Sequence, residues 1–469
     1  MSERVTQALL DDRERILERL MNLVRQPSVS ADPAFAEGMA GARALLMRRL
    51  REAGLQAVQE LEAPGGHAAV YAEWLGAPGR PTLLIYGHYD VQPPDPLAAW
   101  QSPPFAPEIR EGRLYGRGAS DTKATVTIAI ETIAAYLAAG GCPVNVKLFL
   151  EGEEEVGSPS LRPLIAANHA RLQADAVLSA DGSRASVRLP TISTGTRGMA
   201  KMEMRLSTAR KDLHSGRFGG AARNALHEMA RLVASLHDDE GRILVPGFLD
   251  DVRPLSERDR ADAAELAADD ADFYEGFGGS PYGDPDFSLR ERLTLRPTIE
   301  VNGMWGGYQG AGSKTVIPCE AQAKVTMRLA LGQDPGRAAE AVKAHLLARC
   351  PAGVTLSFDK LYGQSAASTL EDDHPLLVAA EKVMGEIFGR RPVRARGGGT
   401  LPITSVFKET LGIDTLRFAF GMPDEDVHAP NEFFRLSSLE EGLRAWSMML
   451  AELGRLRPED FAPFRQAAD

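Results

Sequence analysis

TLLIYGHYD, residues 82–90, is the stretch from which the fold of this 469-residue chain is best inferred. Its apolar residues run without interruption from Leu83 to Tyr86, which is typical of a strand buried on both faces of a sheet. His88 and Asp90 follow, two residues apart, so their side chains point to the same side of an extended chain. A carboxylate beside a histidine commonly fixes the tautomer of a metal-binding imidazole, although an ordinary strand-end turn is the better explanation of this pair when it is taken alone.

The surrounding sequence alternates between strand and helix patterns. Strands are predicted at 67–74, 144–150 and 176–180, in addition to the run at 82–91. Helices are predicted at 3–24, 35–53, 122–139 and from about 159 onward. This alternation predicts an α/β fold with a mostly parallel sheet and helices on both faces.

The pattern changes near residue 195. Strands are predicted at 199–206, 298–302 and 321–329, and helices at 224–237 and 335–349. The acidic segment 250–292, rich in Ala, Gly and Pro, is interpreted as a peripheral insertion. We therefore expect a discontinuous catalytic domain, residues 1–195 and 361–469, with an inserted α+β domain over 196–360.

The net charge and the positions of the cysteines argue against several classes of function and location. The formal net charge of −11 disfavours nucleic acid as a partner, because phosphate binding needs a basic surface. The three cysteines are far apart and form no CxxC pair, which favours a reducing compartment, and we expect a cytoplasmic protein. The N-terminus is too polar for a signal peptide, and no apolar run approaches the roughly 18 residues of a membrane span.

Acidic residues follow two of the predicted strands. The run from Glu151 to Glu155 comes after the strand at 144–150, and Asp181 comes after the strand at 176–180. The carboxyl ends of parallel strands are where ligands bind in open α/β sheets, and gathered carboxylates repel one another unless a cation separates them. Asp121, before a helix, and His428, in a later loop, are weak signals alone. Together these positions give two histidines and three carboxylates, a set that suits two divalent metals sharing one carboxylate.

Five motifs in this order resemble the M20 family of metallopeptidases, most closely the dipeptidase branch that includes carnosinase-like enzymes. The motifs are GHYDVQP (87–93), GRGASDTK (116–123), EGEEEVGS (151–158), LSAD (178–181) and VHAPNE (427–432). The resemblance covers nearly the whole chain. It implies a two-metal hydrolase that cleaves the peptide bond of dipeptides or short peptides. It also implies that the inserted domain, residues 196–360, serves as a lid and as the dimerisation unit.

The resemblance also implies roles for individual residues. One metal would be held by His88 and Asp181, the other by Glu155 and His428, with Asp121 as the bridge. Glu154 would be the general base, Asp90 would orient His88, and the Asp121–Thr122 bond would be cis. Zinc is the expected metal, while manganese and cobalt also suit a mixed nitrogen and oxygen ligand set.

Motifs of the inserted domain match as well. DLHSG, residues 212–216, resembles the segment whose histidine, here His214, enters the active site of a partner subunit, so we expect a homodimer. SKTVIP, residues 313–318, and Arg328 resemble the elements that bind the carboxylate of the substrate, and arginine suits this role because its fork binds carboxylate through two bonds. GGGT, residues 397–400, resembles a substrate loop, with Thr400 where relatives often carry serine. Thr315 and Asn302 are expected to assist.

Two other functions stay open. An N-acyl-amino-acid deacylase would use the same metals and mechanism, but many deacylases carry glutamate at the position of Asp181, where aspartate resembles the dipeptidases. A non-catalytic binding protein of the same fold would be expected to lose ligands or the base, and here all six key positions are present.

Overall fold

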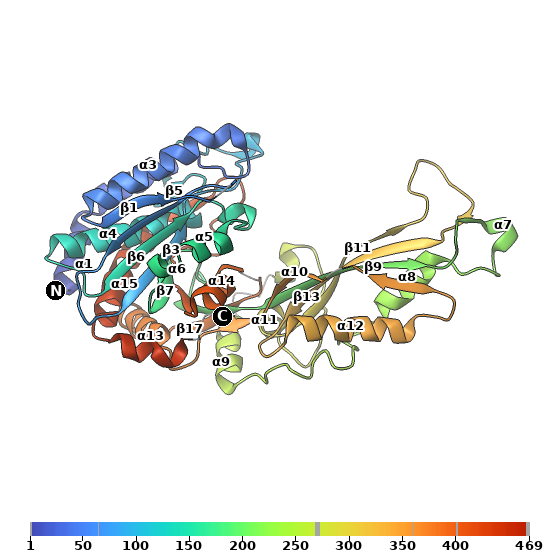
Figure 1. Cartoon of the computed structure of the whole chain (residues 1–469). Helices are drawn as coiled ribbons and strands as arrows, with labels where there is room; N and C mark the ends of the chain where they lie inside the picture. Colours follow the sequence, from blue (N-terminus) through green and yellow to red (C-terminus); the bar gives the residue numbers. More distant parts are fainter. Residues whose placement is uncertain (1, 64, 268–272, 360, 400–401, 466–469) are drawn as a thin grey trace. The chain divides into compact units, whose positions relative to one another are not determined.

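A computed structural model describes residues 2–63, 65–267, 273–359, 361–399 and 402–465, which form two compact units (Figure 1). Unit 1 comprises Met1–Thr194, Leu370–Ala395 and Ile403–Asp469, and unit 2 comprises Gly195–Thr369 and Arg396–Pro402. The second segment of unit 1 begins at Leu370 and not at the predicted residue 361. The reason is that strand β15 (Tyr362–Ser365) still pairs with strand β9 (Gly198–Ser207) of unit 2.

Unit 1 supplies most of a nine-stranded sheet with the order β1-β2-β6-β3-β7-β18-β8-β16, in which β17 also pairs with β8 and the short β16 belongs to the residue range of unit 2. The four central strands, β6, β3, β7 and β18, are parallel, whereas β2 and β8 join them antiparallel. The predicted mostly parallel α/β sheet is therefore confirmed. The strands are β1 (Gln56–Leu61), β2 (Ala69–Trp74), β3 (Thr82–His88), β6 (Asn145–Glu151), β7 (Ala176–Ser179), β8 (Thr191–Thr196), β16 (Ser368–Thr369), β17 (Val393–Gly397) and β18 (Thr415–Arg417).

Alternate residues of the central strands face different helices. Ile85 belongs to the core that contains Val126 of α4 and Trp446 of α15, whereas the ring of Tyr86 contacts Phe407 of α14 on the other face. Each side of the sheet is thus covered, as its continuous apolar runs require. The helices of this unit are α1 (Ser2–Asp11), α2 (Arg13–Val24), α3 (Ala36–Glu52), α4 (Ala124–Ala138), α5 (Leu161–Ala167), α6 (His169–Leu172), α13 (Pro375–Phe388), α14 (Pro402–Leu411) and α15 (Leu436–Leu453).

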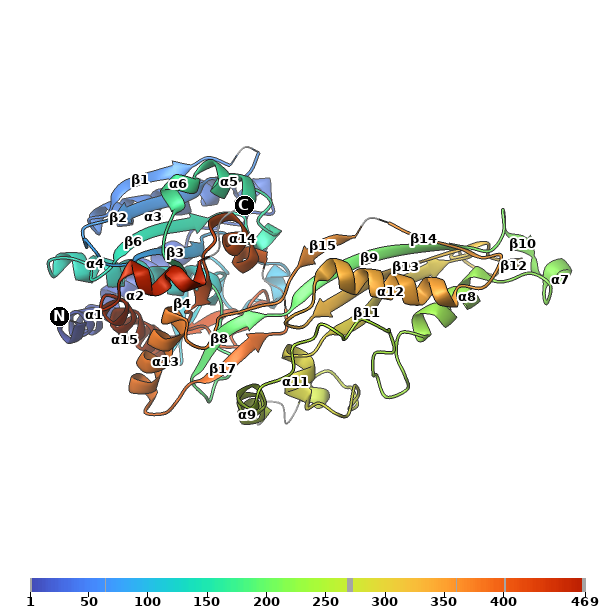
Figure 2. The same cartoon turned by 60° about the horizontal axis from the view of Figure 1, so that its bottom comes forward.

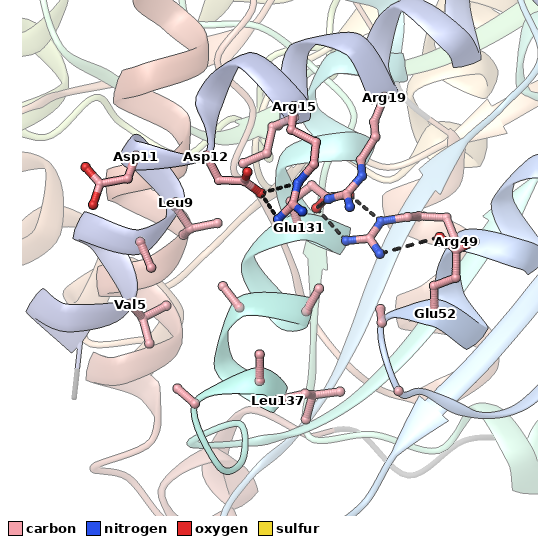
Figure 3. A pocket seen from close by; sticks show the side chains of 18 of the residues that line it. Val5, Leu9, Asp11, Asp12, Arg15, Arg19, Arg49, Glu52, Glu131 and Leu137 are labelled. Carbon is pink, nitrogen blue, oxygen red and sulfur yellow. Dashed lines mark hydrogen bonds and ion pairs between the residues drawn. The ribbon is translucent and has the colours of Figure 1, made fainter.

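The N-terminal helix pair differs from the prediction of one helix over 3–24. The chain breaks at Asp12, whose carboxylate accepts two hydrogen bonds from Arg15 at 2.9 and 2.6 Å. A cavity of about 1040 Å³ lies beside α1, α2 and α4, where the buried carboxylate of Glu131 is bound by Arg19 and Arg49 (Figure 3). None of the predicted site residues lines it.

A small three-stranded sheet joins two distant parts of unit 1. Its strands are β4 (Glu108–Arg110), β5 (Arg113–Tyr115) and β19 (Phe433–Arg435), with β5 in the middle. Phe433 pairs with Tyr115. The segment before Asp121 is therefore fixed beside the segment that follows His428.

Unit 2 contains a five-stranded antiparallel sheet with the order β11-β13-β9-β14, in which β15 also pairs with β9. Its long strands alternate between apolar and polar residues. The apolar side chains form one core with residues of α8 and α12, while the polar side chains lie on the other face. Figure 2 shows the two helices along the sheet. The remaining elements are β10 (Leu213–His214), α7 (Ser215–Phe218), α8 (Ala225–Ala234), α9 (Glu257–Leu266), α10 (Phe273–Gly276), α11 (Leu289–Thr294), β11 (Thr298–Gly306), β12 (Val316–Ile317), β13 (Glu320–Leu329), α12 (Pro335–Arg349) and β14 (Thr355–Phe358).

In the described part of the chain, no helix combines the length and the apolar character needed to cross a membrane.

Candidate metal centre

The predicted ligands come together at the carboxyl edge of the parallel strands. His88 ends β3, Glu155 follows β6 in a short turn, and Asp181 lies two residues beyond β7. Asp121 precedes α4, and His428 lies in the loop before β19. Parallel strands place their carboxyl ends at one edge, which is why side chains so far apart in sequence meet here.

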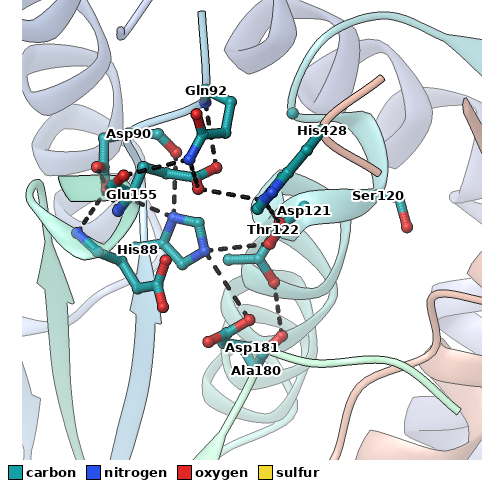
Figure 4. Close-up of polar contacts among 12 residues, drawn as sticks. His88, Asp90, Gln92, Ser120, Asp121, Thr122, Glu155, Ala180, Asp181 and His428 are labelled. Atoms are coloured by element: carbon teal, nitrogen blue, oxygen red, sulfur yellow. Dashed lines mark hydrogen bonds and ion pairs between the residues drawn. The ribbon is translucent and has the colours of Figure 1, made fainter. Parts of the chain in front are cut away.

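Asp121 lies between the two imidazoles (Figure 4). Its Oδ1 is 3.2 Å from Nε2 of His88, and its Oδ2 is 3.0 Å from Nε2 of His428. Nε2 of His428 is also 3.2 Å from Oε2 of Glu155, and Nε2 of His88 is 3.9 Å from Oδ1 of Asp181. Two groups of potential ligands result, and they share Asp121.

Each group fits a divalent cation. One consists of His88, Asp121 and Asp181, the other of Asp121, Glu155 and His428, and within each group the ligand atoms lie within 4.8 Å of one another. Imidazole nitrogen and carboxylate oxygen are ligands that zinc, manganese and cobalt accept. The donor set therefore suits two cations.

Asp90 contacts both His88 and the acidic turn. Its backbone oxygen is 3.1 Å and its Oδ1 3.4 Å from Nδ1 of His88, which leaves Nε2 of that ring directed toward Asp121. Its carboxylate also accepts the amides of Glu154 and Glu155 at 3.3 and 3.1 Å, and the hydroxyl of Ser30 at 2.7 Å. Asp90 is fully buried, so these donors offset the cost of burying its charge.

Other contacts around the ligands were not predicted. Gln92 donates its amide to Oε1 of Glu155 at 3.1 Å and its side-chain amide to Oε2 at 2.9 Å. Thr122 donates its hydroxyl to the carbonyl of Ala180 at 2.8 Å. The cis conformation of the Asp121–Thr122 peptide, in contrast, was predicted. Gln92 lies inside the GHYDVQP motif. This position was the signal in the sequence from which a role for Gln92 near the ligands could have been predicted.

The clustered charges shift the pKa values of these groups. Hydrogen bonds to Asp121 and Glu155 raise the pKa of His428 to about 10. Burial favours the neutral form of Asp121, but hydrogen bonds from the two histidines hold its pKa below the ordinary value. Burial raises the pKa of Asp181 to about 6 and that of Glu154 to about 8. At neutral pH protons thus balance part of the negative charge, and cations that bind here must displace them.

The predicted residues of unit 2 fall into two places. His214 pairs with Val316 through β10 and β12, and the amide of Ser215 donates to the carbonyl of Thr315 at 3.1 Å, so the DLHSG and SKTVIP motifs meet. The His214 side chain is exposed, and its Nδ1 accepts the amide of Gly216 at 3.0 Å.

The second place is the far end of β13. Arg328 is opposite Met199 and Thr298 there. Asn302 accepts a hydrogen bond from Thr326, which shares the polar face of β13 with Arg328. Thr400 lies outside the described residues.

Comparisons with known proteins agree on one family. Residues 84–452 match the model of peptidase family M20/M25/M40. The chain is 30% identical to Beta-Ala-His dipeptidase of Homo sapiens over 82% of this chain and 78% of that protein. It is 28% identical to Cys-Gly metallodipeptidase dug1 of Schizosaccharomyces pombe over 95% of this chain and 97% of that protein.

Solved structures give the same result. The M20 family metallo-carboxypeptidase Sso-CP2 from Sulfolobus solfataricus is similar with a TM-score of 0.77 and 31% identity, covering 94% of this chain and 99% of that one. Human carnosine dipeptidase 1 is similar with a TM-score of 0.74 and 26% identity, covering 97% and 99%. The chain therefore belongs to peptidase family M20/M25/M40.

Proposed function

We propose that this chain is a two-metal dipeptidase that hydrolyses the peptide bond of dipeptides or short peptides. The observation that carries the proposal is the Asp121 carboxylate, whose two oxygens each face one of two imidazoles, His88 and His428. The names of the Beta-Ala-His and Cys-Gly dipeptidases, which match over most of the chain, support this substrate class.

In this proposal His88 and Asp181 would hold one divalent cation, Glu155 and His428 would hold the other, and Asp121 would be shared by both. When bound, the cations supply Lewis acidity that lowers the pKa of water toward about 7 and polarises the substrate carbonyl. Zinc is the expected metal, with manganese or cobalt as alternatives. Asp90 keeps the tautomer and orientation of His88.

Glu154 is the proposed general base. Its carboxyl is close enough to His88, Asp181 and Asp121 for their charges to shift its pKa. Glu154 takes a proton from the attacking water as the water oxygen bonds to the carbonyl carbon, then gives that proton to the amine nitrogen as the C–N bond breaks. The products are a carboxylate and an amine.

The substrate carboxylate is proposed to bind Arg328, assisted by Asn302, Thr315 and Thr400, while His214 stabilises the carbonyl oxygen. Arg328 lies near the end of β13, and His214 lies beyond its beginning at Glu320. A strand rises about 3.3 Å per residue, so roughly 30 Å of chain separates them, far more than a dipeptide spans. We therefore propose that His214 acts on a substrate held by a second copy of the chain.

The proposed homodimer needs a free surface of unit 2. Strand β9 cannot pair with a strand of another chain, because it is interior and pairs with β13 on one side and with β14 and β15 on the other. Among the described strands of this sheet, β11 is at an edge, and Val301 and Met304 on it are exposed. We propose β11 as the dimer edge instead.

A cytoplasmic location is also part of the proposal. The three cysteines, Cys142, Cys319 and Cys350, are free thiols, which suits a reducing compartment.

The test is a hydrolysis panel run on chelated protein to which zinc, manganese or cobalt is added singly. The substrates are dipeptides, the same dipeptides blocked at the amine, tripeptides and N-acyl amino acids. We expect metal-dependent cleavage, fastest for free dipeptides. Faster cleavage of N-acyl amino acids would make the chain a deacylase, and no cleavage with any metal would contradict the proposal.

A further inference from the structure

The backbone that leads into Asp121 is folded around a buried carboxylate, that of Glu432. Oε1 of Glu432 accepts the amides of Ser120 and Asp121 at 2.9 and 3.1 Å. Oε2 accepts the amide of Gly118 at 2.9 Å and the guanidinium of Arg117 at 2.8 Å. Glu432 and Arg117 are each 1% exposed. A fully buried carboxylate is stable only when donors satisfy it, and here three of the four donors are backbone amides of one short loop.

A second buried carboxylate continues this arrangement. Glu425 accepts the hydroxyl of Ser120 at 2.6 Å, the amide of Met422 at 2.9 Å and the guanidinium of Arg435 at 3.1 Å. The side chain of Ser120 points away from the ligand cluster (Figure 4), so its hydrogen bonds serve the loop rather than the site. Ser120 thus donates to Glu425 through its hydroxyl and to Glu432 through its amide.

Both carboxylates flank His428 on the same segment. The residues Asp426, His428 and Asn431 have φ values of 50°, 65° and 66°, a left-handed conformation that is costly for residues other than glycine. The surrounding hydrogen bonds must hold this shape. One segment therefore carries a proposed ligand and also binds the backbone of the proposed bridging residue.

We propose that Glu432 is a positioning residue of the metal centre. By accepting the amides of Gly118, Ser120 and Asp121, it fixes the backbone from which the Asp121 carboxylate projects, so that one oxygen faces each imidazole. The inference rests on the proposed metal-binding function. Ligand sets tolerate displacements of only about 0.5 Å, so groups that orient ligands contribute to metal affinity without touching the metal.

The test compares the full-length chain with Glu432→Gln. Glutamine keeps the shape and one acceptor oxygen, but its NH₂ group faces a backbone amide that also donates. Cobalt and zinc are titrated into the metal-free proteins against a competing chelator, and the cobalt absorption spectrum is recorded. We expect Kd to rise about 10- to 100-fold and the spectrum to change. Wild-type Kd and an unchanged spectrum would overturn the inference.

Glu131→Gln is the matched control. Glu131 is also a buried carboxylate, 4% exposed, and is bound by Arg19 and Arg49, but it belongs to neither ligand group. It lies on α4, about 10 Å along the helix from the first helical residue, Ala124. We expect Glu131→Gln to have a lower Tm than the wild-type chain, with the cobalt Kd and the cobalt spectrum unchanged. If the control weakens metal binding as much as Glu432→Gln does, the effect is a general loss of stability and the inference fails.

Glu432→Asp covers the case in which Glu432→Gln does not fold. Aspartate keeps the charge but is one methylene shorter, so its carboxylate cannot reach the amides of Gly118, Ser120 and Asp121 as that of Glu432 does. We expect Kd to rise about 10-fold, with a changed cobalt spectrum; wild-type values would overturn the inference. A wild-type chain that binds no metal would instead contradict the proposed function, so the two failures are distinguishable.

Discussion

Asp121 is the residue on which both groups of the candidate metal centre depend. The two groups of ligands have no other member in common among the described residues. Glu154, next to the proposed ligand Glu155, is the proposed general base, and burial raises its pKa to about 8. Ligation and proton transfer are thus assigned to adjacent residues of one turn.

The Glu154→Gln variant tests this division. Glutamine keeps the size of the side chain and its hydrogen bonding, but it cannot accept the proton. We expect metal content to stay at the wild-type level and kcat to fall by at least about 10²-fold, the low end for general acid–base catalysis. Elemental analysis and steady-state kinetics check both, and near-normal turnover in the metal-loaded variant would remove Glu154 from the mechanism.

Single residues were predictable where they lie at strand ends. His88, Asp181 and the acidic run each follow an apolar strand, so sequence position alone placed them at one edge. The contacts of Glu432 with Gly118 and Ser120 join residues more than 300 apart in sequence, and no local pattern reports such a contact.

At the scale of elements, helix ends in unit 1 are held by specific side chains. His374 precedes α13, and its Nδ1 accepts the amide of Leu376 at 3.2 Å. Burial lowers the pKa of His374 to about 4, with Lys408 acting in the same direction. A protonated imidazole cannot accept this bond, so the cap requires the neutral ring.

This cap makes stability depend on pH. Between pH 6.5 and 4 the unfolded chain binds a proton at His374 that the folded chain does not, so stability is lost as pH falls through this window, by about 3 kcal/mol at most. Asparagine is also a good cap and does not titrate. With metal-free proteins, we expect the Tm of wild type to fall more from pH 6.5 to pH 4 than the Tm of His374→Asn. Parallel Tm profiles of the two proteins would contradict this.

Elements with strong periodicity were predicted well, and weakly patterned ones were not. Strand β1 was missed because half of Gln56–Leu61 is polar and only Leu61 is buried, so no apolar alternation marks it. The break between α1 and α2 was missed because apolar spacing continues through Asp12. The acidic segment 250–292 contains α9 and the beginning of α11, and each helix begins with a serine capping box that was not predicted.

At the scale of the whole molecule, the proposed metals link distant parts of unit 1. His428 lies after unit 2 in sequence, whereas the other proposed ligands precede it. A ligand that binds the folded state alone stabilises that state, by about 4 kcal/mol at a free concentration of 1,000 Kd. We expect chelation to lower the Tm and added zinc to restore it, measured by calorimetry. An unchanged Tm would show that the ligand groups bind no metal tightly.

The proposed composite site predicts complementation between inactive variants. His214→Ala should retain its metals and lose kcat more than KM. Mixed with Glu154→Gln, it forms hybrid dimers in which one of two sites is intact. Random exchange makes half the dimers hybrid, so activity should recover to roughly a quarter of wild type. If subunits exchange, as labelled chains would show, and no activity returns, His214 acts within its own chain or has no role.

The position of β18 beside β7 in the sheet has a consequence for the growing chain on the ribosome. β7 ends at Ser179 and β18 begins at Thr415, so unit 2 is translated between two strands that must become neighbours. Translation adds roughly 5–20 residues per second, so about 10 to 50 s pass between the synthesis of β7 and that of β18. During this interval the nascent chain contains His88, Asp121 and Asp181 but lacks His428. All residues of the first proposed ligand group are therefore synthesised before the second group is complete.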